Sequence, residues 1–383
     1  MEKNSLLLID LSRNLNLSEK NKQYIYLNKG NIHLNNCKQV KLKNFSNFRK
    51  KSYKVLLKDL KKFILNNTEN KFFLSEMEIF NLRNDRYEFP DRMLNFLIIK
   101  KIILKRKIKK IEIISDNRST LKIFDHLNLK VEKKDFSNND FKVNFPNLKI
   151  IKFLFKTIFL VFFLKFLTRT NKKLNKKNSF YVSLYPNRYF YGKENLFDRE
   201  ENICNFLMSD ETHLNLNLRK LLYFAKITND KNILNLEQFI KISDILLLFL
   251  KHFFNMITFK KLKKIKINFQ GLDLKEELND IYLGSYINRS KLEIYSKAIP
   301  RFLKKSNVSS FNLYLFEYSF GFYLMRSIKE FSNKIKIFGF QHGLFSNNLM
   351  WFDLINSLKH RRMYIPDNIY CLNKFTLKDY KSK

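Results

Sequence analysis

Cysteine is scarce in this chain. The 383 residues include three cysteines, Cys37, Cys204 and Cys371, and they lie far apart. None has a partner at the short spacing of zinc ligands, and their distribution does not form a disulfide framework. The simplest inference is a protein of a reducing compartment.

Acidic residues are also few: 35 Asp and Glu residues stand against 73 Lys and Arg residues, for a formal net charge of +38. Such an excess favours an anionic partner, either a nucleic acid or a membrane surface. The alternative is a compositional cause, because two alanines, one tryptophan and five prolines accompany abundant Lys, Asn, Ile and Phe, as AT-rich codons would dictate. Under either cause the surface is basic and attracts phosphates and acidic lipids.

Signatures of nucleic-acid-binding proteins are missing from the sequence. Aromatic residues alternate with lysines at the spacings of a packed core, and there is no helix-turn-helix, zinc or RNA-recognition motif. A basic nucleic-acid-binding protein is kept as an alternative class, but no specific nucleic-acid partner is expected.

Long uncharged hydrophobic runs are missing too. Leu6–Ile9 is followed at once by Asp10, which makes the run too short for a signal peptide and typical of a first strand. The most apolar segment, 148–167, contains several lysines and so fails the requirement of about 20 mostly uncharged residues for a membrane span. Those lysines are Lys149, Lys152, Lys156 and Lys165.

Helical spacing places Lys149, Lys152 and Lys156 on one face of a helix, and a run of basic residues follows at 169–177. This pattern predicts a helix that lies in the interface of an anionic membrane. The alternative is a core helix followed by a solvated linker. A cytoplasmic location is expected, and the first interpretation adds peripheral attachment to the inner face of the cytoplasmic membrane.

Length and hydrophobic content predict two folded domains, because 383 residues that are 45% hydrophobic can bury two cores of ordinary size. The polar, charged stretch 171–178 is the best boundary, so the expected domains are 1–170 and 178–383. No internal repeat is visible.

Apolar runs typical of strands alternate with helical patterns along the chain. Strands are predicted at 6–9, 111–114, 180–185, 311–316, 335–340 and 369–372, and helices at 53–65, 90–104, 148–167 and 318–331. This alternation predicts an α/β fold with mostly parallel sheets.

The strand, helix and strand between 311 and 340 organise the second half. In a right-handed βαβ unit the two strands are parallel. Glu317 and His342 would then both follow carboxyl ends of strands, where open α/β sheets bind ligands. Since the chain has only seven glycines, Gly343 beside His342 predicts a position where a side chain would block a close approach.

The order of several short motifs resembles a known family. The motifs are Tyr185-Pro186-Asn187, Phe197-Asp198-Arg199, Leu315-Phe316-Glu317, Gly339-Phe340-Gln341-His342-Gly343, Trp351-Phe352-Asp353 and Ile365-Pro366-Asp367-Asn368-Ile369. On these motifs, residues 178–375 resemble bacterial surface-carbohydrate biosynthesis proteins, such as capsule Kdo transferases and the glycerophosphotransferases that build teichoic acids. The first half matches only in the order of its strands and helices.

The resemblance implies an α/β glycosyltransferase with two Rossmann-like domains, the GT-B architecture. It implies a nucleotide-activated sugar donor as substrate and a glycan or lipid-linked acceptor, in the synthesis of lipopolysaccharide, capsule or a related glycan. Such a second domain normally continues beyond Ile369 with further strands and a closing helix, whereas this chain ends at Lys383. A C-terminal domain that is incomplete is therefore expected. An inactive truncated remnant, or a non-catalytic partner of a glycan assembly complex, is a further alternative.

Candidate donor-site residues follow the strands of the second half. His342 could donate a hydrogen bond to a phosphate or leaving-group oxygen, and the alternative is a structural histidine in a loop. Glu317 could bind ribose or sugar hydroxyls, or pair with Arg326 or a lysine. Gln341 could read the donor through its amide, or stabilise a turn.

The remaining candidates concern the acceptor and the phosphates. Asp116, at the end of its strand, is the natural candidate for a general base, and the alternative is a helix cap together with Ser119. Arg361 and Arg362 could meet a diphosphate or could be solvated. No Asp-x-Asp motif is present, so Lys, Arg, His and helix N-termini would have to neutralise the donor. Metal-independent transfer without a cofactor is expected.

Overall fold

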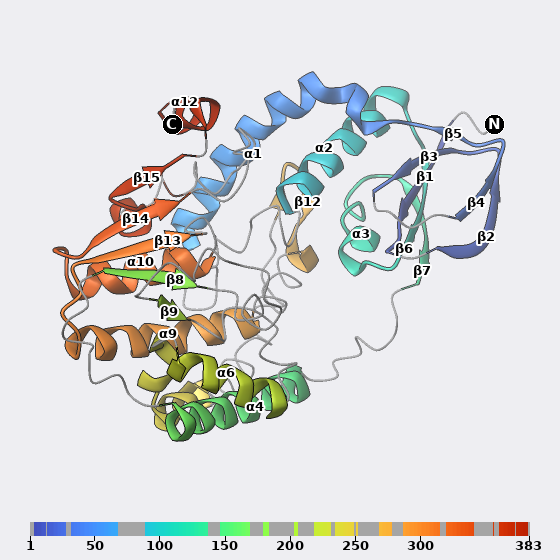
Figure 1. The fold of residues 1–383 in the computed structure, drawn as a ribbon. Coiled ribbons are helices and arrows are strands. Elements are labelled where there is room, and N and C mark those ends of the chain that lie inside the picture. The colour runs from blue at the N-terminus through green and yellow to red at the C-terminus, as the bar shows by residue number, and fades with distance from the viewer. Residues whose placement is uncertain are drawn as a thin grey trace. The chain divides into compact units, whose positions relative to one another are not determined.

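The architecture is that of an α/β protein, seen in a computed structural model (Figure 1). The structure describes residues 4–12, 14–27, 32–67, 89–136, 146–168, 179–183, 203–205, 218–230, 234–248, 250–251, 268–277, 286–314, 319–340, 355, 360–371 and 373–381. Within these ranges all strand pairs are parallel except one short hairpin, which confirms the predicted class of fold.

The chain divides into two compact units. Unit 1 consists of residues 1–75, 81–145 and 258–284, and unit 2 of residues 76–80, 146–257 and 285–383. Apart from residues 76–80, this division differs from the expected domains, 1–170 and 178–383, in two places. Helix α4 (Pro146–Leu167) belongs to unit 2, and the hairpin of β11 (Asn268–Phe269) and β12 (Leu272–Asp273) belongs to unit 1.

Hydrogen bonds explain both differences. Lys165 Nζ of α4 donates to the carbonyl oxygen of Ile240 at 2.7 Å, which ties the helix to unit 2. In the hairpin, Gln270 Nε2 donates to Asp59 Oδ2 at 2.9 Å, within unit 1. The turn between its strands is Gln270–Gly271, where both residues have positive φ, 51° and 72°, as a two-residue type I′ turn requires.

Unit 1 contains a five-stranded parallel sheet in the order β5–β3–β1–β6–β7. Its strands are β1 (Ser5–Asp10), β3 (Gln23–Tyr26), β5 (Lys38–Gln39), β6 (Lys110–Ser115) and β7 (Lys130–Asp135). Leu6–Ile9 in the central strand are fully buried, as the apolar run predicted. Numbered along the chain, the strand order is 3-2-1-4-5, so the order reverses between β1 and β6.

The helices described in unit 1 are η1 (Leu42–Phe45), α1 (Ser46–Asn67), α2 (Phe89–Arg106) and α3 (Arg118–Lys122), and residues 275–277 are also helical. Helices α1 and α2 contain the predicted helical segments 53–65 and 90–104. Pro90 stands in the first turn of α2, where a missing N–H costs no helical hydrogen bond. Met93, Ile98 and Ile102 on this helix are buried.

Two short strands take the place of crossover helices on the other face of the sheet. β2 (Leu15–Lys20) and β4 (Ile32–Asn35) pair in parallel, and Leu15 and Leu34 pack against the core around Leu7 and Ile9. The strands between residues 5 and 39 therefore follow one another as successive parallel coils, a repeat that was not visible in the sequence. Asn21 and Asn36 end equivalent strands with φ of 56° and 53°, a conformation that asparagine tolerates better than most residues.

Four charged side chains fasten β2 to this sheet. Glu19 and Glu112 are each 7% exposed, and both accept hydrogen bonds from Lys22 and Lys134. Lys22 Nζ lies 2.7 Å from Glu19 Oε2, and Lys134 Nζ lies 2.9 Å from Glu112 Oε1. Burial would raise the pKa of Glu19, but the hydrogen bonds from Lys134 and Lys22 outweigh it and lower that pKa.

The free energy of unfolding of a Glu19→Gln variant is expected to fall less than that of the parent as the pH is lowered. Because the pKa of Glu19 is lowered by folding, its carboxylate stabilises the fold above its ordinary pKa of 4.5, and this contribution is lost as the pH falls through the folded value. Urea unfolding between neutral and acid pH measures the effect. Asp125→Asn, which removes an exposed partner of Lys133, is the matched control. Parallel curves for Glu19→Gln and the parent would contradict the expectation.

Unit 2 contains a six-stranded parallel sheet in the order β10–β9–β8–β13–β14–β15. Its strands are β8 (Ser179–Ser183), β9 (Ile203–Asn205), β10 (Leu234–Asn235), β13 (Ser310–Tyr314), β14 (Lys336–Phe340) and β15 (Asn368–Tyr370). Numbered along the chain, the order is 3-2-1-4-5-6, with the reversal between β8 and β13. Doubly wound nucleotide-binding sheets have this order and bind their ligands at the reversal.

The strand, helix and strand predicted between 311 and 340 are confirmed. β13 and β14 are adjacent and parallel, with Phe311 opposite Ile337, and α10 (Ser319–Phe331) connects them. The other helices described in unit 2 are α4, α6 (Leu218–Asp230), η7 (Leu236–Phe239), α9 (Tyr286–Lys304), η8 (Arg361–Tyr364) and α12 (Lys374–Lys381). Residues 242–248 and 250–251 are also helical. Phe302 of α9 packs edge-on against Phe180 of β8, with ring centroids 5.4 Å apart, at the centre of this core.

Candidate functional site

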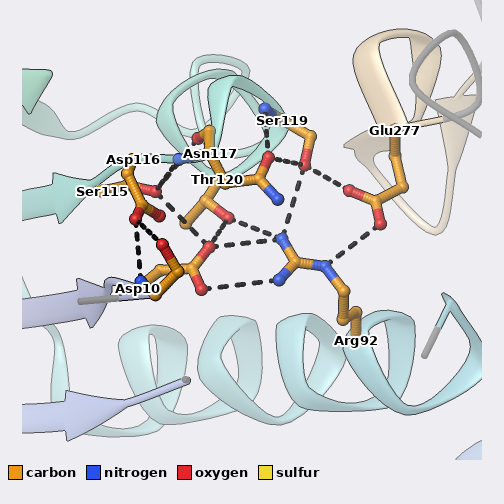
Figure 2. A network of polar contacts seen from close by, with 9 residues as sticks. Asp10, Arg92, Ser115, Asp116, Asn117, Ser119, Thr120 and Glu277 are labelled. Atoms are coloured by element: carbon orange, nitrogen blue, oxygen red, sulfur yellow. Dashed lines mark hydrogen bonds and ion pairs between the residues drawn. The ribbon is translucent and has the colours of Figure 1, made fainter. Parts of the chain in front are cut away.

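Polar side chains gather at the carboxyl edge of the unit 1 sheet, beside the reversal of strand order (Figure 2). Asp10 ends β1 and Ser115 ends β6, and the two residues are paired in the register of the sheet. Their side chains are fully buried, and Ser115 Oγ donates to Asp10 Oδ2 at 3.4 Å. The start of α3 follows β6 directly and brings Thr120 to the same carboxylate.

Arg92 of α2 lies at the centre of this cluster (Figure 2). Its Nε donates to Glu277 Oε1 at 3.1 Å, and its Nη2 donates to Asp10 Oδ2 at 3.3 Å and to Thr120 Oγ1 at 2.8 Å. Ser119 Oγ donates to the other oxygen of Glu277, which is 5% exposed. Arg92 Nη1 donates to Asp10 Oδ1 at 3.5 Å, so every guanidinium nitrogen of Arg92 has a partner in the protein.

The charges of the cluster decide what it can bind. Burial would lower the pKa of Arg92, but the carboxylates of Glu277 and Asp10 outweigh it and raise that pKa, so the guanidinium is always charged. Two carboxylates against one cation leave an excess of negative charge, which would repel a diphosphate. We interpret the Arg92 cluster as a structural clasp, meaning a set of ion pairs and hydrogen bonds that holds residues 272–277 against the sheet.

Asp116 stands at the predicted strand end, directly after β6. Its Oδ2 accepts hydrogen bonds from Ser12 N, at 2.8 Å, and from Ser12 Oγ. The alternative role as a helix cap with Ser119 is wrong. Asn117 caps α3, and its Oδ1 accepts from Ser119 N at 2.9 Å, because Asn117 has the extended backbone of an N-cap while Ser119 is already helical. The half-buried carboxylate of Asp116 remains our candidate for the general base.

The predicted donor-site residues Glu317, Gln341, His342 and Gly343 lie outside the described residues. The strands that precede them are described. β13 ends at Tyr314, next to the reversal of strand order, and β14 ends at Phe340. In the chain, Glu317 and Gln341 come three residues and one residue after these strand ends.

Arg361 and Arg362 do not fit the expected role at a diphosphate. Both are exposed in η8, which comes just before β15 in the chain. At that end of the sheet Asp367 N donates to the carbonyl oxygen of Ile337 at 2.8 Å, near the start of β14. The two arginines therefore belong to the amino edge of the sheet, whereas the ligand edge of a parallel sheet is the carboxyl one.

The sequence predicted that a polar site would follow the end of the strand at 111–114. It did not predict Arg92, Glu277 or the contacts between them. Asp10 directly follows the apolar run Leu6–Ile9, which indicates a buried carboxylate, and a buried charge needs a partner. Arg92 is a charged residue close to the start of an apolar helical pattern. Nothing in the sequence around Glu277 distinguishes it from a surface glutamate.

Two features of the described part of the chain bear on partners. Within it, no group of three or more His, Cys, Asp and Glu side chains could hold a metal ion. None of the helices described there has the length and apolar character needed to cross a membrane. Comparison of the chain with protein-family models, with curated proteins and with solved structures finds no match.

Proposed function

We propose that the protein is a GT-B-like glycosyltransferase of bacterial surface polysaccharide synthesis. It would transfer a sugar from a nucleotide-activated donor to a glycan or lipid-linked acceptor without a metal ion. The observation that carries this proposal is the 3-2-1-4-5-6 order of the parallel sheet in unit 2. Sheets of this order bind nucleotides at the carboxyl ends of the strands that flank the reversal.

The unit 1 sheet gives further support, because its strand order, 3-2-1-4-5, matches that of the first five strands of the unit 2 sheet. Two Rossmann-like sheets in one chain are the parts of a GT-B enzyme. The excess of negative charge in the Arg92 cluster disfavours a donor diphosphate in unit 1. Donor binding is therefore assigned to unit 2.

Each donor-site residue has a role that its chemistry allows. His342, two residues beyond the end of β14, donates a hydrogen bond to the phosphate oxygen that leaves with the nucleotide. Glu317 accepts hydrogen bonds from ribose or sugar hydroxyls, and the Gln341 amide contacts the donor. Gly343 lets the backbone approach the ligand closely, since it has no Cβ.

The acceptor needs a general base in this reaction. The acceptor oxygen attacks the anomeric carbon, the bond to the leaving phosphate breaks, and a carboxylate takes the proton of the acceptor hydroxyl. Asp116 at the carboxyl end of β6 is our candidate for this group. Its bonds to Ser12 hold one carboxylate oxygen in a fixed position.

A Glu317→Gln variant tests the donor contact. It is expected to weaken donor affinity about tenfold or more, because a charged acceptor of hydrogen bonds becomes a neutral one, while turnover at saturating donor changes less. Titration calorimetry with a panel of nucleotide sugars measures the affinity. Glu330→Gln makes the same substitution at an exposed residue of α10 that pairs with Arg326 and serves as control. Equal donor affinity of Glu317→Gln and the parent would remove Glu317 from the site.

A further inference from the structure

Helix α4 carries apolar side chains on two opposite faces. One face is buried in unit 2 through Phe153, Leu160, Val161 and Leu164. The other face exposes a row of large apolar side chains at intervals of three and four residues, which is one side of a helix. They are Ile151 (37% exposed), Phe155 (69%), Phe159 (50%), Phe162 (62%) and Phe166 (80%).

The helices beside α4 also expose large apolar side chains. Asn229 Nδ2 of α6 donates to the carbonyl oxygen of Leu167 in α4 at 3.0 Å, and the two helices lie side by side (Figure 1). Lys165 Nζ of α4 donates to the carbonyl oxygen of Ile240, just before the helical residues 242–248 and 250–251. The exposed apolar residues of these two helices are Leu218, Leu222, Tyr223, Ile242, Leu246, Leu247 and Leu250. Together with the row on α4 we call them the apolar face of unit 2.

Positive charge borders the apolar face. α4 contains no acidic residue, and Lys152 and Lys156 flank its row of phenylalanines. The exposed cations on the neighbouring helices and at their ends are Arg219, Lys226 and Lys241, whereas Lys251 is paired with Glu293 at 2.9 Å. Asp244, the acidic residue within 242–251, is already bound by Arg301 at 2.8 Å. The face therefore combines a large apolar area with an excess of positive charge.

We propose that unit 2 docks on an anionic phospholipid bilayer through this apolar face. The exposed phenylalanines enter the boundary between headgroups and acyl chains, and the lysines reach the lipid phosphates at its border. A second copy of the chain fits the face poorly, because two such surfaces would bring cations against cations without carboxylates to match them. The proposal adds α6 and residues 242–251 to the interfacial helix that the sequence indicates, and it does not depend on glycosyl transfer.

Vesicle sedimentation tests the docking surface. The parent is expected to bind phosphatidylcholine vesicles that contain phosphatidylglycerol, and to bind pure phosphatidylcholine vesicles much more weakly. Joint replacement of Phe155, Phe162 and Phe166 by serine is expected to lower binding about a hundredfold or more, because the area that enters the bilayer is lost. Joint replacement of Lys152 and Lys156 by glutamine is expected to lower it about thirtyfold.

Matched controls separate docking from general attraction to a basic protein. Leu104→Ser replaces a residue that is 65% exposed in unit 1, and Lys54→Gln with Lys58→Gln removes two exposed charges from α1. Both controls should bind vesicles like the parent. If the phenylalanine variant keeps its circular dichroism spectrum and still binds like the parent, the proposal is wrong. The proposal would also be overturned if the parent did not bind vesicles but formed dimers in sedimentation velocity that the phenylalanine variant did not form. That result would favour self-association.

Discussion

A His342→Ala variant is expected to lose about a hundredfold or more in the rate of glycosyl transfer while its fold stays intact. A hydrogen bond to the leaving phosphate strengthens as negative charge develops there, so its removal raises the barrier by about 2–4 kcal/mol. Single-turnover transfer, or donor hydrolysis where the acceptor is unknown, measures the rate. Thermal melting of the variant checks the fold.

His360→Ala is the matched control for this experiment. His360 is exposed just before η8, at the amino edge of the same sheet, so its loss should leave the rate unchanged. Equal rates for His342→Ala and the parent would remove the catalytic role of His342. A large drop in its melting temperature would instead show that His342 is a structural residue of a loop.

An Arg92→Met variant is expected to destabilise unit 1 by about 3–5 kcal/mol, because it leaves the buried carboxylates of Asp10 and Glu277 without their cation. Methionine keeps much of the volume of the side chain, so the loss reports on charge rather than on a cavity. Urea unfolding measures the change in the free energy of unfolding. Hydrogen exchange should also rise in 268–277, the segment that the clasp fastens.

Arg106→Met is the control for the clasp, since Arg106 ends the same helix and binds Gln23 at the surface. Its cost should stay below about 1 kcal/mol. Adding Asp10→Asn and Glu277→Gln to Arg92→Met should recover part of the lost stability, because the uncompensated charges disappear. Equal costs for Arg92→Met and Arg106→Met would mean that the cluster is not a clasp.

Local patterns predicted the elements whose partners are close in the chain. β13, α10 and β14 form one crossover unit, so period, length and handedness were enough to predict their parallel pairing. The position of Asp116 directly after a strand was also predicted from local sequence, because a buried apolar run followed by polar residues indicates where the strand ends. Its hydrogen bonds to Ser12, 104 residues away, were not predictable.

Long-range contacts explain what the sequence could not reveal. Arg92 binds Asp10 across 82 residues and Glu277 across 185 residues, and no local pattern links such positions. α4 was assigned to the first domain because it precedes a polar stretch, but its buried face packs on unit 2, where Gln238 binds Thr168. The coils of residues 5–39 were missed because their strands have two to six residues, too few for a clear period.

Titration of the 383-residue parent with nucleotide sugars shows whether the protein binds an activated sugar donor. The panel should include UDP-, GDP-, CDP- and CMP-activated sugars, and binding should be measured by calorimetry without added metal. We expect saturable binding of at least one donor at one site, competition by the matching free nucleotide, and weaker binding by Glu317→Gln. A folded parent that binds none of these donors would contradict the account, as would one that binds nucleic acid with sequence discrimination instead.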